Sequence, residues 1–284
     1  MLVPDRLQVL WGDVAADRLS AEAFMEEQAR LLGAYREQWE RALLEGAETD
    51  LRTGLFREMA AYAKADLDEI ERRCGGALAD LRSEWQRDVD PGERSSIERF
   101  YESSTTMYEL MDWHSLRDDN GPLAYVLGLE IARQHRVESC LDFGSGVGSG
   151  ALLFSAAGID TTLADISSTL LDFCRWRLER RALRARFLDL KQAELPEAGF
   201  DMILAMDVFE HLADPADTAE RVWRALKPGG LLFARIHAED DPDRPQHIVR
   251  DFEPTFERMR ALGLVETWRD GWLWGHQLFE KRRG

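Results

Sequence analysis

Residues 141–150 read LDFGSGVGSG, and this stretch decides the fold. The apolar run 137–143 leads into it and has the length of one strand, while the apolar segment 151–157 after it is expected to form a helix. A glycine-rich turn between a strand and a helix lets a ligand approach the backbone closely, and the helix start offers free N–H groups. The stretch therefore predicts a ligand site at the carboxyl end of a strand.

The same pattern of strand, turn and helix repeats toward the C-terminus. Further strands are expected at 161–164, 185–188, 200–206, 231–236, 264–268 and 272–279, with helices at 167–181, 214–226 and 252–262 between them. Alternation of this kind is typical of a mostly parallel sheet with helices on both faces. We therefore expect an α/β fold with a doubly wound sheet.

The first 120 residues carry a different pattern. Apolar residues at three-to-four spacing predict one helix over 20–46 and another from Asp50 to Trp85, with a break or bend at Gly75-Gly76. Ser95 and Glu98 fit a capping box that would start a third helix reaching Met111, and a fourth is expected over 122–136. This predicts two domains: an all-helical N-terminal extension at 1–120 and an α/β domain at 121–284. A lid, a homodimer interface and a substrate cover are the roles open to the extension.

The chain is acidic and has few cysteines. Its 284 residues hold 36 Lys and Arg against 53 Asp and Glu, a formal charge of −17. Nucleic acids and anionic lipids attract clusters of basic residues, so we expect neither as a partner. Three scattered cysteines without zinc-type spacing predict no disulfide framework and no metal site. The absence of a signal peptide pattern or a long apolar run predicts a cytoplasmic protein.

Three kinds of ligand suit a glycine loop: a nucleotide phosphate, a dinucleotide or another adenosyl ligand. A nucleotide phosphate bound by a P-loop is excluded because no Gly-Lys-Ser/Thr follows. A dinucleotide finds a weak match, since Gly146, Gly148 and Ala151 have GxGxxA spacing. Asp142, at the end of the strand, would repel a pyrophosphate but suits a ligand with an ammonium group and no phosphate. Asp165, at the end of the second strand, is placed to accept hydrogen bonds from both ribose hydroxyls of an adenosyl ligand.

Taken in order, these motifs resemble those of the class I S-adenosylmethionine-dependent methyltransferases. The resemblance covers DFGSGVG at 142–148, Asp165, LDL at 188–190, FDMILAMDVFEHL at 200–212 and KPGG at 227–230. It implies a Rossmann-like sheet of seven strands, with the last strand antiparallel and inserted beside the fifth. It also implies S-adenosylmethionine as the cofactor and methyl transfer to an oxygen, nitrogen or carbon atom of a small molecule, by in-line displacement.

The resemblance also implies a set of cofactor-binding residues. They are Asp142, Gly144, Ser145, Gly146, Gly148, Asp165, Ile166, Asp189, Leu190, Met206, Asp207 and Tyr108. Tyr108 enters this set because Tyr101 and Tyr108 are seven residues apart, hence on one face of the expected third helix, which would close over the cofactor.

Three residues are candidates for catalysis. His211 suits a general base because an ordinary histidine has a pKa near 6.5, although it would equally serve to fix the loop under the cofactor. His247, in the loop after the fifth strand, is expected to contact the substrate or to remove a proton. Asp207 would orient the substrate or hold the loop.

Two other functions fit the same sequence. One is a regulatory protein that binds the cofactor without turnover, and the other, based on the GxGxxA spacing alone, is an NAD-dependent oxidoreductase. The residues DVFE at 207–210 replace the Asn-Pro-Pro-Tyr-type motif of DNA-base methylases, which argues against a DNA substrate.

Overall fold

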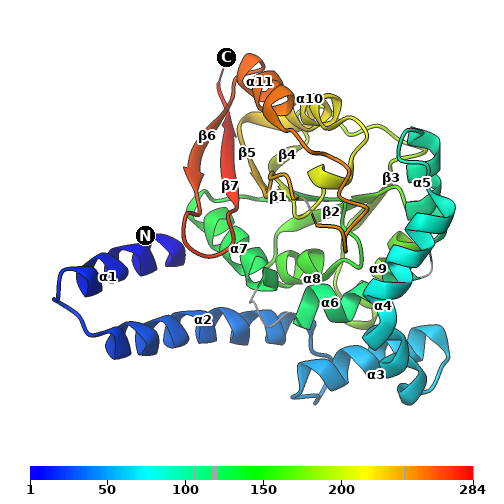
Figure 1. Cartoon of the computed structure of the whole chain (residues 1–284), viewed down its shortest axis with the longest axis horizontal. Helices are drawn as coiled ribbons and strands as arrows, with labels where there is room; N and C mark the ends of the chain where they lie inside the picture. The colour runs from blue at the N-terminus through cyan, green and yellow to red at the C-terminus, as the bar shows by residue number, and fades with distance from the viewer. Residues whose placement is uncertain (105, 117–120, 240, 284) are drawn as a thin grey trace.

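The computed structural model describes all residues except 105, 117–120, 240 and 284. At its centre lies a seven-stranded sheet in the order β3-β2-β1-β4-β5-β7-β6 (Figure 1). Strands β1 to β5 are parallel, whereas β7 runs antiparallel to both β5 and β6. The strands are β1 (Ser139–Phe143), β2 (Asp160–Asp165), β3 (Arg186–Asp189), β4 (Phe200–Ala205), β5 (Leu226–Ala234), β6 (Leu264–Arg269) and β7 (Gln277–Lys281). The predicted fold class, including the antiparallel strand beside the fifth, is confirmed.

Helices cover both faces of the sheet, as the doubly wound prediction requires. On one face lie α7 (Ala124–Gln134), α8 (Ser149–Ala156) and α9 (Ser168–Arg180), and on the other α10 (Pro215–Ala225) and α11 (Glu253–Ala261) (Figure 1). Side chains alternate along a strand, so β4 sends Met202 and Leu204 into the first core and Ile203 and Ala205 into the second.

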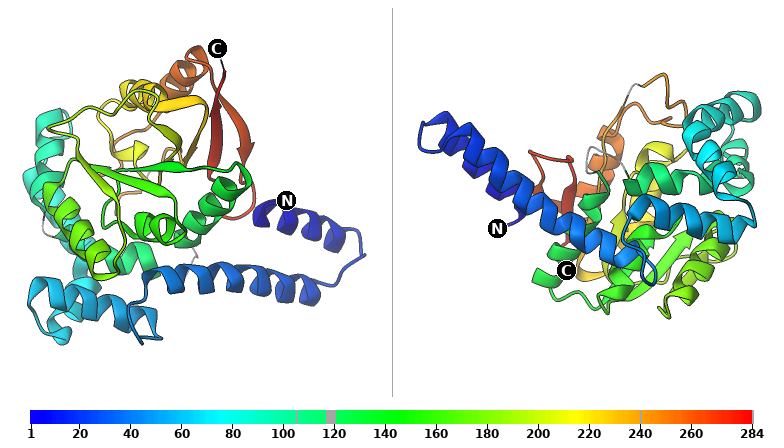
Figure 2. Two further views of the ribbon diagram at one scale, coloured as in Figure 1. Left: turned by 180° about the vertical axis from the view of Figure 1, so that it is seen from behind. Right: turned by 90° about the horizontal axis from the view of Figure 1, so that it is seen from below.

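The N-terminal region is helical, as predicted, and its first two helices form an arm. Figures 1 and 2 show them antiparallel and extending away from the sheet. The elements are α1 (Val3–Ala15), α2 (Ala21–Leu43), α3 (Leu51–Ala63), α4 (Leu67–Asp88), α5 (Arg94–Ser103), η1 (Thr106–Tyr108), α6 (Leu110–Leu116) and η2 (Gly121–Leu123). Helix α1 was not expected from the sequence pattern.

Two helix boundaries in this region were predicted wrongly. The helix starting after Asp50 ends at Ala63 and is followed by Lys64, which has a φ of +54°. The side chain of Asp66 caps the next helix by accepting from the Glu69 N–H at 2.8 Å. Gly75 and Gly76 therefore lie within α4 instead of breaking it.

The expected third helix is also shorter and begins one residue earlier than Ser95. Helix α5 begins at Arg94 and ends at Ser103, so Ser95 is not its cap, and Tyr101 and Tyr108 belong to different elements. The Ser96 hydroxyl instead accepts from the Asp90 N–H at 3.0 Å, which ties it to the turn before the helix.

The last strand starts later than predicted because an aspartate folds the chain before it. The Asp270 carboxylate accepts from the backbone N–H groups of Trp272, Leu273 and Trp274 at 2.8–2.9 Å. Three N–H groups turned toward one carboxylate cannot join a sheet, so β7 begins only at Gln277.

The N-terminal helices share the hydrophobic core of the α7–α9 face. One continuous cluster of buried side chains extends from Leu2 in the arm to Leu278 in β7. Trp39 stacks on Tyr125 with ring centroids 5.6 Å apart, and Tyr62 packs against Phe173 at 4.6 Å. The packing thus joins the N-terminal helices and the α/β part in one core. The division of the chain into two domains at residue 120 stays a prediction.

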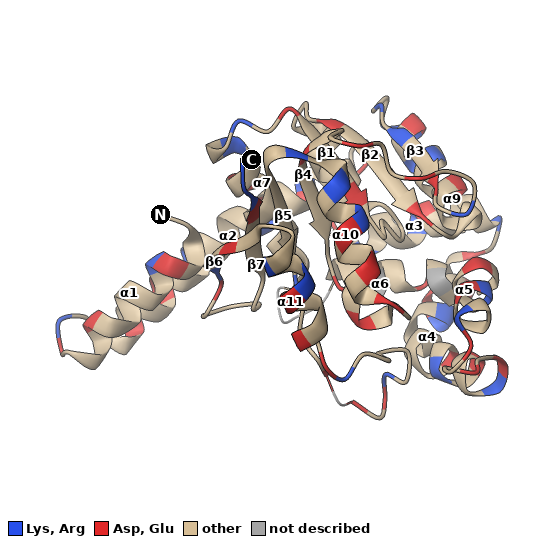
Figure 3. Ribbon diagram, turned by 90° about the horizontal axis from the view of Figure 1, so that it is seen from above, with Lys and Arg blue, Asp and Glu red and all other residues tan. Residues whose placement is uncertain are grey.

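Surface charges of both signs are mixed on this framework. Figure 3 shows Asp and Glu interspersed with Lys and Arg along α10 and α11. None of the described helices combines the length and apolar character that a bilayer crossing requires.

A buried ionic network joins the N-terminal helices to the glycine loop. Glu58 of α3 pairs with Arg177 of α9 and with Arg181 just beyond it, and all three side chains are almost completely buried. The Arg177 guanidinium also donates to the Val147 carbonyl at 2.6 Å and lies 3.2 Å from the Ser149 hydroxyl. The Arg177 guanidinium therefore supports the loop between β1 and α8, and Glu58 of α3 neutralises its charge.

We predict that Glu58→Ala destabilises the protein by about 3–5 kcal/mol, because it leaves two buried guanidinium groups without their carboxylate. Glu45→Ala is the matched control. Glu45 also joins the N-terminal region to α9, through Arg180 at 2.9 Å, but both side chains are partly exposed, and we expect a loss below about 1 kcal/mol. Urea unfolding of the two variants measures the difference. Equal losses would contradict the role given to the buried network.

Candidate functional site

The glycine loop between β1 and α8 is packed tightly on one side and open on the other. Gly144, Gly146 and Gly148 have φ angles of +69°, +53° and +75°, which side-chain-bearing residues rarely adopt. A methyl group on Gly144 would lie 2.7 Å from Val208, and one on Gly148 would lie 2.7 Å from Cys174. At Gly146 no described atom comes within 4 Å of that position. The open side of the loop thus lies at Gly146.

Two buried carboxylates stand beside this opening. Asp142, at 1% exposure, has an Oδ2 atom without a hydrogen-bond partner in the described chain, and burial raises its pKa to about 7. The Asp165 carboxylate accepts from the Gly146 N–H and from the Ser167 N–H, both at 2.9 Å, and burial raises its pKa as well. Asp165 therefore shapes the loop, while Asp142 keeps a free acceptor.

The remaining strand-end residues follow the same edge of the sheet. Asp165 and Asp189 are register partners in β2 and β3, and the Leu190 N–H donates to the Asp165 carbonyl at 3.0 Å. The Asp189 carboxylate accepts from the Lys191 N–H at 3.0 Å. Ile166 directly follows β2, and Met206 and Asp207 directly follow β4. Of the predicted cofactor residues, all but Tyr108 thus belong to the carboxyl ends of strands β1 to β4. Their contact with a cofactor stays a prediction.

Tyr108 lies in η1, against the start of α9. Its hydroxyl donates to the Thr169 carbonyl at 3.4 Å, and its ring packs on Phe173 and Tyr62 with centroid distances of 5.3 and 5.6 Å. Tyr101 of α5 instead reaches the loop after β4, where its hydroxyl is 2.9 Å from His211 Nδ1. The two tyrosines that were expected on one helix face thus contact different parts of the site.

Asp207 is fixed by an arginine that the sequence pattern did not reveal. Its φ is +53°, and its Oδ1 lies 2.7 Å from Nε of Arg235, the residue after β5. Burial alone would raise the pKa of Asp207, but Arg235 and the neighbouring histidines together outweigh it, and the pKa is lowered. This pairing links the loops after β4 and β5 and is consistent with a loop-holding role.

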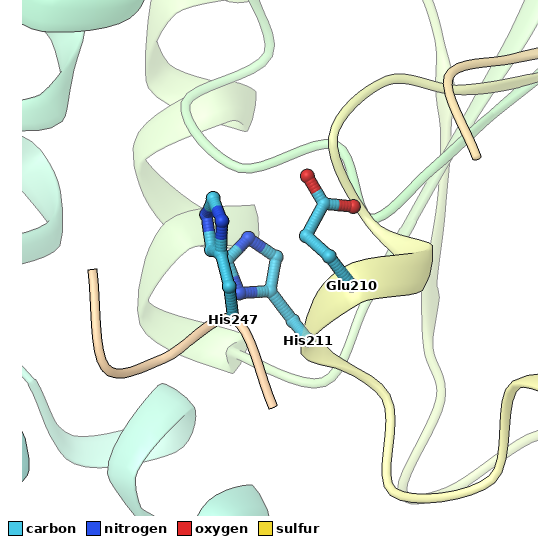
Figure 4. Close-up of side chains that lie close together, drawn as sticks. All are labelled: Glu210, His211 and His247. Carbon is cyan, nitrogen blue, oxygen red and sulfur yellow. The ribbon is translucent and has the colours of Figure 1, made fainter. Parts of the chain in front are cut away.

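Glu210, His211 and His247 form a cluster between these two loops. One ligand-type atom of each lies within 4.8 Å of the others, and Figure 4 shows the carboxylate and the two imidazoles turned toward one another. Backbone hydrogen bonds hold the loops together here, since the Glu210 carbonyl accepts from the Ile248 N–H at 2.9 Å. His211 and His247, both predicted site residues, are thus brought together.

The Nδ1 atoms of both histidines lie close to oxygen atoms of neighbouring residues. His211 Nδ1 is 3.1 Å from the Gln246 carbonyl, which can only accept, so we place the ring hydrogen on this nitrogen. His247 Nδ1 is 3.0 Å from Glu239 Oε2. Burial and the neighbouring His247 lower the pKa of His211 to about 3, well below the ordinary value near 6.5 that was expected for it. His211 is therefore neutral across the physiological range.

Glu210, a member of this cluster, and His276 nearby were not predicted as site residues. Glu210 is 2% exposed, and burial together with the charge of Asp207 raises its pKa to about 8. His276, before β7, stacks on Phe233 at 5.2 Å, and burial lowers its pKa to about 4. The adjacent pair Glu210-His211 was a visible signal in the sequence, whereas nothing in the spacing marked Arg235, Glu239 or His276.

We predict that Asp142→Asn raises the melting temperature at pH 8, because it removes a buried charge without changing shape. The Asp142 pKa is 3.8 ordinarily and about 7 in the folded chain, so the folded state binds its proton more tightly. In the wild type, the resulting loss of folding free energy from ionised Asp142 is absent below about pH 4, grows as the pH rises to about 7 and is constant above that. Melting curves of both proteins at pH 5, 6, 7 and 8 test this. A pH-independent difference would contradict the burial of an unpaired carboxylate.

Comparisons with known proteins point to one kind of domain. Residues 141–232 match a family model described as a methyltransferase domain. Demethylmenaquinone methyltransferase of Thermus thermophilus is 30% identical over 108 residues, which cover 37% of this chain and 49% of that protein. The tRNA 5-carboxymethoxyuridine methyltransferase of Escherichia coli K12 is 29% identical over 97 residues, which cover 32% and 37%. The matched region spans less than half the length of both relatives.

A solved structure is similar to part of this chain. An N-methyltransferase 2 of Haemonchus contortus, in complex with phosphomonomethylethanolamine and S-adenosylhomocysteine, is 20% identical with a TM-score of 0.47, and the match covers 62% of this chain and 45% of that one.

Proposed function

We propose that this chain, which belongs to the class I S-adenosylmethionine-dependent methyltransferase family by its domain at residues 141–232, transfers a methyl group from that cofactor to a small-molecule acceptor. One observation carries the proposal. The open side of the glycine loop follows β1, and the cluster of Glu210, His211 and His247 follows the next two strands, β4 and β5, at the same edge of the sheet. A cofactor cradle beside polar side chains from two loops is what a transfer reaction between two bound molecules requires.

The residues around the cradle suit S-adenosylmethionine. This cofactor supplies an electrophilic methyl group on a sulfonium, together with an ammonium group and an adenosine. The unpartnered Oδ2 of Asp142 suits the ammonium, and Gly146 leaves room for close approach to the backbone. Asp165 is already oriented by the Gly146 and Ser167 N–H groups, and its remaining lone pairs suit ribose hydroxyls. Ile166, Asp189, Leu190 and Met206 would complete the adenosine side.

On the acceptor side, three separate segments converge. Tyr101 comes from α5, His211 from the turn after β4, and His247 from the loop after β5. Holding an acceptor in line with the methyl group can supply a large part of the acceleration. A neutral His211 with a strongly lowered pKa is a weak base, so we assign His211 and His247 to orienting the acceptor and Asp207, through Arg235, to fixing the loop.

The acceptor class follows from charge and from the relatives. Those relatives act, by their names, on a quinone precursor and on tRNA. The formal charge of −17 disfavours a polyanion, because phosphate backbones are bound mainly by Lys and Arg clusters. We therefore favour a small-molecule acceptor. A cytoplasmic location, expected from the sequence, stays a separate proposal.

The test is methyl transfer from radiolabelled S-adenosylmethionine, run in parallel with a panel of hydroxylated, carboxylated and amino compounds and with total tRNA. Label in a small-molecule product is the expected result. Label in tRNA alone would overturn the acceptor class. Cofactor binding without transfer to any compound would favour a regulatory protein, and reduction of a nicotinamide would favour an oxidoreductase.

We predict that Gly146→Ala abolishes cofactor binding at modest cost in stability. The new methyl group would protrude into the open side of the loop, where the cofactor is expected to lie. Gly158→Ala is the matched control, since Gly158 has a φ of +83° and equally open surroundings but lies in the turn before β2. Both variants should lose about 1 kcal/mol of stability from the positive φ. Calorimetric titration with S-adenosylmethionine should show binding to Gly158→Ala only.

We also predict a homodimer formed through the α1–α2 arm. Val9, Trp11 and Met25 on this arm are 56%, 46% and 69% exposed. Large apolar side chains that stay exposed on a projecting element are candidates for contact with a second chain. Light scattering should give the mass of two chains for the wild type and of one chain for the triple variant V9S/W11S/M25S. A monomeric wild type would contradict the prediction.

A further inference from the structure

Glu210, His211 and His247 have the composition and placement of a metal site. Their ligand-type atoms lie within 4.8 Å of one another, and Figure 4 shows them facing a common space. Two ligands that each lie about 2.1 Å from one cation are at most about 4.2 Å apart. A small side-chain adjustment would therefore bring all three groups onto one ion. Spacing in the sequence gave no sign of this, because His247 comes from a different loop.

The contacts of the two histidines leave one nitrogen of each ring for a ligand. Nδ1 of His211 faces the Gln246 carbonyl and the Tyr101 hydroxyl, and Nδ1 of His247 lies 3.0 Å from the Glu239 carboxylate, at ion-pair distance but without hydrogen-bond geometry. Metal-binding histidines typically present their second nitrogen to a carbonyl or carboxylate in this way, which fixes the ring and directs the other lone pair at the metal. The Nε2 atoms are thus the available donors.

Glu210 supplies an independent observation. Its side chain is 2% exposed, and neither carboxylate oxygen has a hydrogen-bond partner in the described chain. An isolated buried carboxylate is costly unless a cation or hydrogen bonds compensate it. The nearby Arg235 guanidinium is engaged with Asp207 at 2.7 Å. Among the described residues, Glu210 therefore has neither a hydrogen-bond partner nor a cation of its own.

We propose that Glu210, His211 and His247 bind one divalent transition-metal ion. Two imidazoles and one carboxylate are a ligand set for Zn²⁺, Fe²⁺ and related ions, and three protein ligands leave coordination positions open. The ion lies just beyond β4, next to the glycine loop, which Val208 contacts through Gly144. Its open positions suit an oxygen donor such as a hydroxyl, which a bound cation orients and makes more acidic. This last step rests on the proposed methyl transfer, whereas metal binding does not.

Metal binding can be tested without any acceptor. The full chain, freed of affinity tag and stripped with a chelator, is titrated with Co²⁺ and followed by its visible absorption, and Zn²⁺ affinity is then obtained by displacement. We expect one ion per chain, with binding lost in Glu210→Gln and in His247→Gln. Glu239→Gln, which alters the partner of His247 and of Arg244 but none of the three proposed ligands, should weaken binding 10- to 100-fold. His135→Gln, an exposed histidine after α7, should bind as the wild type does.

Two measurements guard against variants that fail to fold. In the wild type, Zn²⁺ should shift the imidazole nitrogen resonances of two of the six histidines. Calorimetry with S-adenosylmethionine should show cofactor binding in every folded variant. Absence of Co²⁺ and Zn²⁺ binding by the wild type overturns the metal site. Binding by Glu210→Gln and His247→Gln with the affinity of the wild type overturns it as well. Loss of cofactor binding in the wild type instead overturns the proposed function, so the two failures are distinguishable.

Discussion

The Arg177 guanidinium is the constraint on which the arrangement of this molecule depends. It is fully buried under the glycine loop, where it donates to the Val147 carbonyl, and its charge is neutralised by Glu58 from α3. Removing a guanidinium from water is expensive, and a buried guanidinium without its carboxylate is an uncompensated charge. The N-terminal helices therefore contribute, through Glu58, to the support of the glycine loop. They are packed into the same core as the α/β part and are not an appendage to it.

The fold was predictable because its signals are local. Short stretches of sequence predict the strand before LDFGSGVGSG, the positive-φ glycines and the terminal pair of strands. The order of the strands in the sheet then follows from the resemblance. The sequence pattern predicted the helix break at the glycine pair further along and missed the one at Lys64. The break lies at Lys64 because Asp66 caps the start of the next helix. Glycine weakens a helix by about 1 kcal/mol, which side-chain packing readily overrides.

The site was predictable only in part, for a related reason. Asp142, Asp165 and His211 lie in motifs, so their types and positions were visible. Arg235 and Glu239 matter because the loop after β5 folds back onto the turn after β4, and no spacing within the chain encodes that contact. The ionisation of His211 likewise depends on burial by segments as distant in the chain as α5, which is why the ordinary pKa was a poor guide.

Burial moves the ionisable groups that bear on ligand binding in one direction, toward their neutral forms. The pKa values of Asp142 and Glu210 are raised, and those of His211, His247 and His276 are lowered. Asp207, held by Arg235, is the exception. A positively charged ligand reverses this for the carboxylates, since an opposite charge within a few ångströms favours the ionised form. Both proposed ligands are positive: the ammonium and sulfonium of the cofactor beside Asp142, and a divalent ion beside Glu210. The low polarity that makes these carboxylates unfavourable alone strengthens their attraction for such ligands, so the same burial that destabilises the free protein gives the two sites their selectivity for cations.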